Sequence, residues 1–489
     1  MAAKVAGCFL ILSALGTRPQ LAAQSPKPDP TQILRSFRLV ATGANGQPVT
    51  DLRPEEVQLS DEGKRYPLVS ARLLRAAPSV GLGQTAALGP REFSNRGANQ
   101  LLSSTLILID LLNANITERG ATWNEVIQSL GGQEHAENVF LFLLTPDPSL
   151  YAVHSWAPQG APAGTPSAPW TSQIRQLLDQ ALRVVERIKP VDLEAAPGLT
   201  AEPTYRALAD LGRQYAALPG QKRMIWITHG IPLTVVGPNG TVYMDFNPLL
   251  KQTGAEFSRE GIALYTVHQL DRSTAGVNSE ETLQGLPPLT GGRWFENDAV
   301  GPAITQAQAD ARGTYQAAYY APAKTADGKF HKLRVSTTRK GVRILAAEGY
   351  TAAAPEEIAQ SNLELVASRP FDTPDIGLRA SLTTPGKTTH VQIHADPRDL
   401  LLQHGGNTYT GALSLVFIYY NADSSQSASQ PVMSNVSLTQ QQLDAAMKDG
   451  YSFNADVDVP SGTRKLRLMV QDTATGIAGS LTMPVTGSP

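Results

Sequence analysis

One acidic residue stands out in the stretch TLILIDLLNANITERG, residues 105–120. Asp110 directly follows an apolar run at positions 106–109, and the amides Asn113 and Asn115 come shortly after it. Open α/β sheets bind ligands at the carboxyl ends of their strands, so an aspartate there can hold a metal ion or a substrate. A third alternative is that Asp110 only orders its own loop, by accepting hydrogen bonds from nearby amides.

Several common catalytic and nucleotide-binding motifs are missing from the sequence. It contains no Gly-x-Ser-x-Gly nucleophile elbow and no His-Glu-x-x-His zinc motif. The Gly-Lys-Thr at 386–388 lacks the first glycine of a phosphate-binding loop, because Ser381 occupies that position. His390 and His394 would share one face of a strand without a nearby acidic pair, so we interpret them as surface residues. We therefore expect no enzyme.

Charge and cysteine content exclude further classes of function. The chain has 41 Lys+Arg and 43 Asp+Glu, a net charge of −2 without a dense basic run, so nucleic acid is not an expected partner. Cys8 is the only cysteine of the 489 residues. If it is lost with a signal peptide, the mature chain has no disulfide and no thiolate metal ligand.

The first residues are typical of a secretory signal peptide. Lys4 precedes an apolar run at 5–16 that is too short to span a bilayer, and Ala22 and Ala23 offer a cleavage point. We expect residues 1–23 to be removed and the mature protein to be periplasmic or secreted. The lipobox-like VAGC at 5–8 lies before the apolar run, so we expect no lipid anchor. No other segment is apolar enough to predict membrane insertion.

Strand and helix patterns alternate between residues 104 and 350. Apolar strand patterns occur at 105–110, 138–145, 223–228 and 262–268, with a fifth at 315–321. Amphipathic helix patterns lie between them, for example at 171–190, 204–220 and 247–261. This alternation predicts an α/β domain over 104–350 with a doubly wound, mainly parallel sheet and helices on both faces.

The flanking regions are expected to be β-rich. Short strands punctuated by turns predict a small β module at 35–75, and the Gly/Ala/Asn-rich stretch at 76–103 predicts a linker. From 363 to 489, closely spaced strands predict a β-sandwich of the immunoglobulin or fibronectin type III kind. We expect the hinge before this sandwich at 352–362.

Several segments match a known family in the same order. They are GANGQPVTDLRPEEVQLSDEGK, LILIDLLNAN, GQKRMIWITHG, GIALYTVHQLD, TGGRWFEND and YQAAYYAPAKTADGKFHKLRVSTTRKGVRILAAEGYTA. The chain resembles the von Willebrand factor type A (VWFA)-related family of acidobacterial genomes. The resemblance implies a signal peptide, a small β module, a von Willebrand A-like α/β domain and a β-rich tail.

The same resemblance implies a metal-ion-dependent adhesion site that has lost its ligands. Such a site binds Mg²⁺ through an Asp-x-Ser-x-Ser motif, a later threonine and a second aspartate. Asp110 matches the first aspartate, but Leu112 and Ala114 stand at the serine positions. Thr200 would be the threonine, and His229 stands at the second aspartate. Asp110 is thus the candidate metal ligand, and we expect neither Mg²⁺ nor another cofactor.

The residues of this degenerate site are expected to form a binding face. It would contain Asp110, Asn113, Asn115, Thr200 and His229. Asn113 and Asn115 are shifted by one position from the lost serines, so in a regular loop their side chains should point elsewhere. Asp110 would then pair with His229 or with loop amides.

Two functions follow as expectations. The first is a non-enzymatic, adhesion-type protein that contacts an unidentified protein partner with the carboxyl-end loops or a helix face. The alternative is an extracytoplasmic hydrolase that uses Asp110, His229 and Thr200 as an acid/base cluster. An enzyme requires a deep pocket with these three groups within hydrogen-bond reach, whereas a flat or closed site favours binding.

Overall fold

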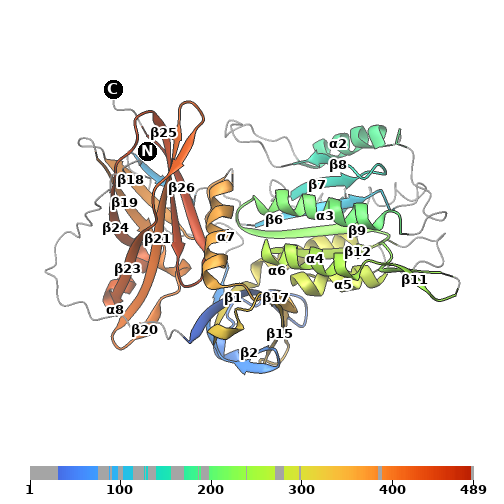
Figure 1. The fold of residues 1–489 in the computed structure, drawn as a ribbon, viewed down its shortest axis with the longest axis horizontal. Helices are drawn as coiled ribbons and strands as arrows, with labels where there is room; N and C mark the ends of the chain where they lie inside the picture. The colour runs from blue at the N-terminus through green and yellow to red at the C-terminus, as the bar shows by residue number, and fades with distance from the viewer. Residues whose placement is uncertain are drawn as a thin grey trace, which may run out of the picture.

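Three β-rich parts lie side by side in the computed structural model (Figure 1). They are a sandwich, a mixed sheet covered by helices, and a small β module below and between them. The structure describes residues 31–74, 91–96, 103–113, 139–155, 170–185, 198–237, 239–269, 280–296, 299–369, 371–383 and 388–485, with a few single positions between these ranges. The predicted signal peptide at 1–23 and Asn115 lie outside the described residues.

The mixed sheet has six strands in the order β13-β12-β9-β6-β7-β8. All neighbours are parallel except β8, which runs antiparallel to β7 at one edge. The central strands consist of buried residues at almost every position, because both faces of the sheet are covered. The strands are β6 (Ser103–Asp110), β7 (Val139–Leu144), β8 (Leu150–His154), β9 (Gln221–Thr228), β12 (Ile262–His268) and β13 (Trp294–Phe295).

Alternate residues of β6 enter two separate cores, one on each face of this sheet. Leu106 and Leu108 pack with α3, α4 and α5, whereas Ile107 and Ile109 pack with α2 and α6. The helices are α2 (Trp170–Val185), α3 (Ala201–Ala216), α4 (Asn247–Arg259), α5 (Glu280–Thr290) and α6 (Val300–Arg312).

The β module combines strands from before and after the mixed sheet. One of its sheets has the order β16-β1-β14-β4, and the other has the order β17-β15-β2-β3. The strands are β1 (Gln32–Gly43), β2 (Val57–Asp61), β3 (Lys64–Tyr66), β4 (Leu68–Leu73), β14 (Thr314–Pro322), β15 (Phe330–Thr337), β16 (Val342–Ala346) and β17 (Gly349–Thr351). The mixed sheet is therefore inserted between β4 and β14.

The predicted doubly wound, mainly parallel α/β fold is wrong. Antiparallel pairing predominates, and of the six sheets among the described residues only the one that contains β6 is mixed. The pattern at 315–321, predicted as a fifth parallel strand, belongs to β14, which pairs antiparallel with β1 from Gln32↔Pro322 to Val40↔Thr314. Alternation of apolar residues identifies a strand and its buried face, but it contains no information on the neighbouring strand or its direction.

The C-terminal sandwich consists of two antiparallel sheets around one core. One sheet has the order β24-β19-β18-β5, and the other has the order β20-β21-β25-β26 with β22 and β23 also on β21. The strands are β18 (Leu378–Thr383), β19 (Thr389–Ala395), β20 (Gln403–Gly405), β21 (Thr408–Asn421), β22 (Gln426–Ala428), β23 (Val432–Thr439), β24 (Tyr451–Val457), β25 (Thr463–Asp472) and β26 (Ala478–Pro484). A helix, α8 (Gln440–Asp449), connects β23 to β24.

Two segments between the predicted domains have regular structure of their own. Within the predicted linker, β5 (Glu92–Ser94) pairs with β18 and so completes a sheet of the sandwich. Most of the stretch expected to be a hinge, 352–362, lies in α7 (Pro355–Ser368). Val366 of this helix packs against Val416 and Met469, because α7 covers the outer face of the sandwich. Figure 1 shows α7 between the sandwich and the mixed sheet.

We expect Gly291→Val to lower the free energy of unfolding by about 1–3 kcal/mol. Gly291 has φ +72°, and a Cβ atom there would lie 3.2 Å from the backbone nitrogen of Ala347. A β-branched residue meets both the strained backbone and this close contact. Thermal melts should rank Gly291→Val far below His390→Ala, since His390 is exposed and its ion pair with Asp456 is worth little. Equal melting midpoints would contradict the ranking.

Candidate functional site

Asp110 is the last residue of β6, in the interior of the mixed sheet between β7 and β9. The parallel register places it beside Leu144, the last residue of β7. Its exposed fraction is 0%. A carboxylate at the carboxyl end of such a sheet is in position for a ligand, but one without exposed atoms cannot contact a ligand unless its surroundings open.

Five hydrogen bonds surround the Asp110 carboxylate. Its Oδ1 accepts from the backbone nitrogens of Leu112 at 3.1 Å and Asn113 at 3.0 Å. Its Oδ2 accepts from Asn113 Nδ2 at 2.7 Å, Trp226 Nε1 at 3.2 Å and Thr228 Oγ1 at 2.8 Å. An ionised carboxylate has about four lone-pair positions, so this acceptor is saturated.

The five donors determine the chemistry of Asp110. Burial raises the pKa of Asp110 above its ordinary value, and the hydrogen bonds from Asn113, Thr228 and Trp226 offset part of that rise. Because the partners donate toward the carboxyl group, they favour its ionised form. A Mg²⁺ ion would have to displace several of them and would still lack the oxygen ligands that octahedral coordination needs. The geometry supports a carboxylate that orders its own loop.

Asn113 does not point away from Asp110, as the sequence had suggested. Its side-chain amide donates both to Asp110 Oδ2 and to Thr204 Oγ1, the latter at 2.9 Å. Residues 111–113, directly after β6, are therefore folded back over the carboxylate and are not extended. Asn115, the other amide of the predicted face, lies outside the described residues.

Thr200 and His229 are not among the donors to Asp110. Thr200 is buried just before α3, and its carbonyl oxygen accepts from Thr204 Oγ1 at 2.7 Å. It is thus linked to Asp110 only through Thr204 and Asn113. At the end of β9 the residue that reaches Asp110 is Thr228, and His229, the next residue, is half-buried. The structure does not assemble Asp110, His229 and Thr200 into a hydrogen-bonded acid/base cluster.

Sequence reasoning missed three residues of this cluster: Thr204, Trp226 and Thr228. Two features of the sequence point to these residues. Trp226 and Thr228 are two apart on β9, so they face the same side of the sheet, which is the side of the α3 core. Thr204 is four residues after Thr200 in the first turn of α3, where a hydroxyl can bond back to the carbonyl of residue i−4.

A hairpin beside this cluster exposes apolar side chains. It consists of β10 (Thr234–Val236) and β11 (Val242–Asp245), which follow the loop after β9. Figure 1 shows β11 extending away from the helices at the edge of the molecule. The exposed fractions are 53% for Val236, 53% for Val242, 67% for Tyr243 and 45% for Met244.

The hairpin packs against the turn before α3. A Cβ atom at Gly198 would lie 2.6 Å from Val235 Cγ2 and 3.5 Å from Met244 Sδ, so this turn packs directly under the hairpin. Leu199, the next residue, is 58% exposed. We call Leu199, Val236, Val242, Tyr243 and Met244 the hairpin patch. Several exposed apolar residues on one hairpin and its adjoining turn are typical of segments that bind another protein.

Comparison with known proteins leaves the function open. No protein-family model and no curated protein matches the chain. Among solved structures it is similar to a mutant β-glucosidase from Listeria innocua in complex with laminaribiose, with 12% identity, a TM-score of 0.15, and coverage of 86% of this chain and 48% of that chain. A β-glucosidase from the same organism in complex with isofagomine gives 11% identity, a TM-score of 0.15, and coverage of 86% and 49%.

The chain spans about half the length of these glucosidases. At such a low TM-score the likeness carries no argument for fold or activity. The resemblance to the von Willebrand factor type A-related family is tested by none of these comparisons and stays a prediction.

Proposed function

We propose that this chain is a non-enzymatic, exported protein that binds another protein through the hairpin patch. The observation that carries the proposal is the exposure of five apolar side chains on one hairpin and the adjoining turn. Aromatic residues and methionine are enriched in protein interfaces. The patch contains Tyr243 and Met244, both on β11. Burying them against a partner would remove apolar area from water.

The Asp110 cluster supports binding in preference to catalysis. A general acid or base must come within hydrogen-bond reach of its substrate. Asp110 is fully buried, and its hydrogen bonds hold the loop after β6 against β9 and, through Asn113, against α3. The cluster therefore supports a rigid platform beside the hairpin patch.

The proposed location outside the cytoplasm rests on the sequence of residues 1–23. In the part of the chain that the structure describes, no helix is long and apolar enough to cross a membrane. The partner is accordingly expected among proteins of the same compartment.

Photo-crosslinking in the native host tests the proposal. A crosslinking amino acid in place of Tyr243 should form an adduct of one defined mass, because Tyr243 is the most exposed residue of the patch. The matched control position is Met433 on the sandwich, an apolar residue with 55% exposure. No adduct is expected there.

A second variant connects the adduct to the patch. With the crosslinker at Leu199, Tyr243→Ser together with Met244→Ser should reduce the adduct about tenfold or more, since losing an interface anchor costs about 2 kcal/mol. If Met433 gives the same adduct, or if the double serine variant leaves the yield unchanged, the hairpin patch is not the binding surface.

A further inference from the structure

A second polar cluster lies in the β module, outside the site described above. Asp61 is the last residue of β2, Glu62 begins the turn into β3, and His331 is the second residue of β15. A carboxylate oxygen of Asp61, one of Glu62 and a ring nitrogen of His331 all lie within 4.8 Å of one another. Asp61 and His331 are buried, with exposed fractions of 3% and 8%, whereas Glu62 is exposed.

The spacing between His331 and Asp61 is that of two metal ligands. His331 Nδ1 lies 3.4 Å from Asp61 Oδ1, beyond the usual range of about 2.7–3.2 Å for an N–H···O hydrogen bond. Zinc binds imidazole nitrogen and carboxylate oxygen at about 2.0–2.2 Å, so tetrahedral geometry places neighbouring ligand atoms roughly 3.3–3.6 Å apart. The observed separation fits an ion between the two atoms.

Other side chains hold these two candidate ligands in the orientation that metal binding requires. His331 Nε2 lies 3.2 Å from Asp327 Oδ1, so the carboxylate can accept its proton and leave Nδ1 to face Asp61. Tyr319 and Tyr350 donate their hydroxyl groups to Asp61 Oδ2 at 2.9 and 2.7 Å. These contacts occupy the far atoms of both ligands and leave Asp61 Oδ1 and His331 Nδ1 toward each other.

The negative charge of the cluster also favours a bound cation. Three carboxylates, those of Asp61, Glu62 and Asp327, surround one imidazole, and no ion pair among the described residues joins them to a lysine or arginine. The nearby Arg35 stacks on the Tyr350 ring and donates to two backbone carbonyl groups instead. A cation between Asp61 Oδ1 and His331 Nδ1, which lie 3.4 Å apart, would offset this negative charge.

We propose that Asp61, Glu62 and His331 bind a divalent transition-metal ion, with Zn²⁺ as the ion that this donor set fits best. Imidazole together with carboxylates suits Zn²⁺, whereas Mg²⁺ prefers oxygen ligands alone. Glu62 is exposed at the turn, and its Oε1 accepts from the backbone nitrogen of Lys332, the residue after His331, which holds the carboxylate beside the other two ligands. A water molecule completes the tetrahedron. The ion joins the turn between β2 and β3 to β15, 270 residues along the chain from Asp61, and so fastens the two halves of the β module together.

Titration of tag-free protein that has been stripped with EDTA tests this site. Calorimetry should show one equivalent of Zn²⁺ bound, and thermal melts should show a higher midpoint with Zn²⁺, because an ion that binds only the folded state stabilises it. Mg²⁺ at the same concentration should leave the midpoint unchanged.

Variants distinguish this site from adventitious binding. Glu62→Gln, at an exposed position that should not disturb folding, is expected to weaken Zn²⁺ binding at least tenfold. Asp327→Asn should weaken it roughly 10–100-fold, the usual effect of losing the carboxylate behind a ligating histidine. His390→Gln, a histidine–aspartate pair on the sandwich, is the matched control and should bind like the natural protein.

Two results would overturn the proposal. One is the absence of saturable Zn²⁺ binding, which would mean that His331 only links Asp61 and Asp327 by direct contacts. The other is equal Zn²⁺ affinity in Glu62→Gln, Asp327→Asn and His390→Gln, which would place the bound ion elsewhere.

Discussion

Replacing Asp110 with alanine is expected to lower the free energy of unfolding by about 3–5 kcal/mol, because leaving even two buried donors unsatisfied costs about 1–3 kcal/mol each. Five donors converge on this carboxylate, from the loop after β6 and from Trp226 and Thr228 on β9. Denaturation in guanidinium chloride, followed by tryptophan fluorescence, measures the loss directly, since Trp226 is buried and bonds to Asp110.

Two further variants locate the cause of this loss. Asp245→Ala removes an exposed carboxylate that accepts two hydrogen bonds from the neighbouring Asn247, and we expect a much smaller change than for Asp110→Ala. Asp110→Asn keeps the shape but presents an amide to some of the donors, so its loss should be intermediate. If Asp110→Ala is no more damaging than Asp245→Ala, the carboxylate does not order the loop, and a ligand-binding role for Asp110 regains support.

The sequence allowed the position of Asp110 to be predicted, but not its partners. An unbroken apolar run followed by an aspartate places the carboxylate at the end of a buried strand. The contacts that decide its role come from Thr228 and Trp226, 118 and 116 residues further along the chain. A regular loop would direct the Asn113 side chain away from Asp110. Instead, the hydrogen bonds from Asn113 to the carboxylate fold residues 111–113 back over it.

The errors in the fold prediction have a similar physical origin. The strand at Thr314–Pro322 was identified, but it joins β1 and β4 instead of the mixed sheet. The local pattern of apolar residues determines which residues of a strand are buried. Which strand it pairs with depends on the sheet edges formed by segments far away in the sequence. The mixed sheet presents β13 and β8 as its edges, and the chain leaves it after α6 to close the β module.

The pairing of the short strand β5 is likewise not predictable from the local sequence. Its three residues lie in a Gly/Ala/Asn-rich stretch without periodicity, so nothing local predicts that they add an edge strand to a sandwich near the other end of the chain. Polar residues directly after the strand explain the contact. Asn95 donates to the carbonyl groups of Thr373, Ile376 and Ser480, and it accepts from the backbone nitrogen of Leu378.

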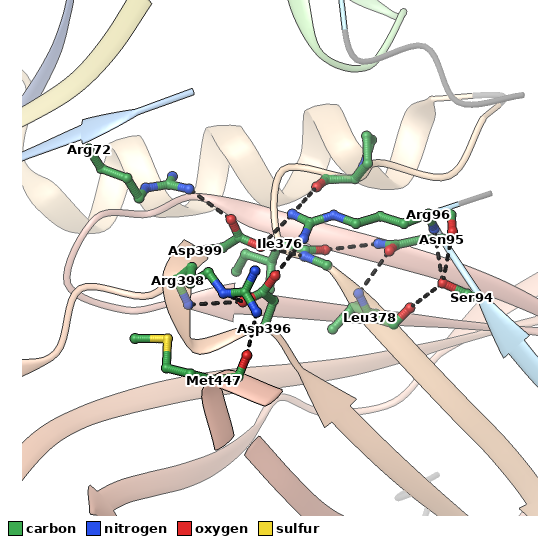
Figure 2. A network of polar contacts seen from close by, with 12 residues as sticks. Arg72, Ser94, Asn95, Arg96, Ile376, Leu378, Asp396, Arg398, Asp399 and Met447 are labelled. Atoms are coloured by element: carbon green, nitrogen blue, oxygen red, sulfur yellow. Dashed lines mark hydrogen bonds and ion pairs between the residues drawn. The ribbon is translucent and has the colours of Figure 1, made fainter. Parts of the chain in front are cut away.

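Arg96 leads to the second prediction of large effect. Figure 2 shows its guanidinium between two carboxylates of the sandwich. Nη1 donates to Asp396 Oδ2 at 2.8 Å, and Nη2 donates to Asp399 Oδ2 and to the carbonyl oxygen of Pro374. Arg96, Asp396 and Asp399 are all buried. Arg72 of β4 reaches Asp399 Oδ1 at 2.9 Å and ties the same carboxylate to the β module.

We expect Arg96→Met to destabilise the sandwich by about 3–5 kcal/mol, because it removes the buried cation that bridges Asp396 and Asp399. The two buried carboxylates then keep the more exposed Arg398 and Arg72 as cationic partners. Methionine keeps most of the apolar stem, so the loss reports on the guanidinium and not on packing. Hydrogen exchange should speed up in β18, which would lose β5 from its edge, more than in β25 at the centre of the opposite sheet. Arg206→Met, which breaks an exposed pair with Glu202, is the matched control and should change stability by less than about 1 kcal/mol.

A compensating variant separates charge from shape. Adding Asp396→Asn and Asp399→Asn to Arg96→Met removes the two buried negative charges that have lost their shared cation, so part of the lost stability should return even though three ionic groups are gone. If the triple variant is less stable than Arg96→Met alone, the carboxylates matter mainly for their bonds to the backbone nitrogens of Gly377 and Arg398. If Arg96→Met leaves exchange in β18 unchanged, β5 is held by its strand pairing and Asn95 alone. Recovery would instead mean that the buried charge of Arg96, two residues after β5, fastens this part of the chain to the C-terminal sandwich.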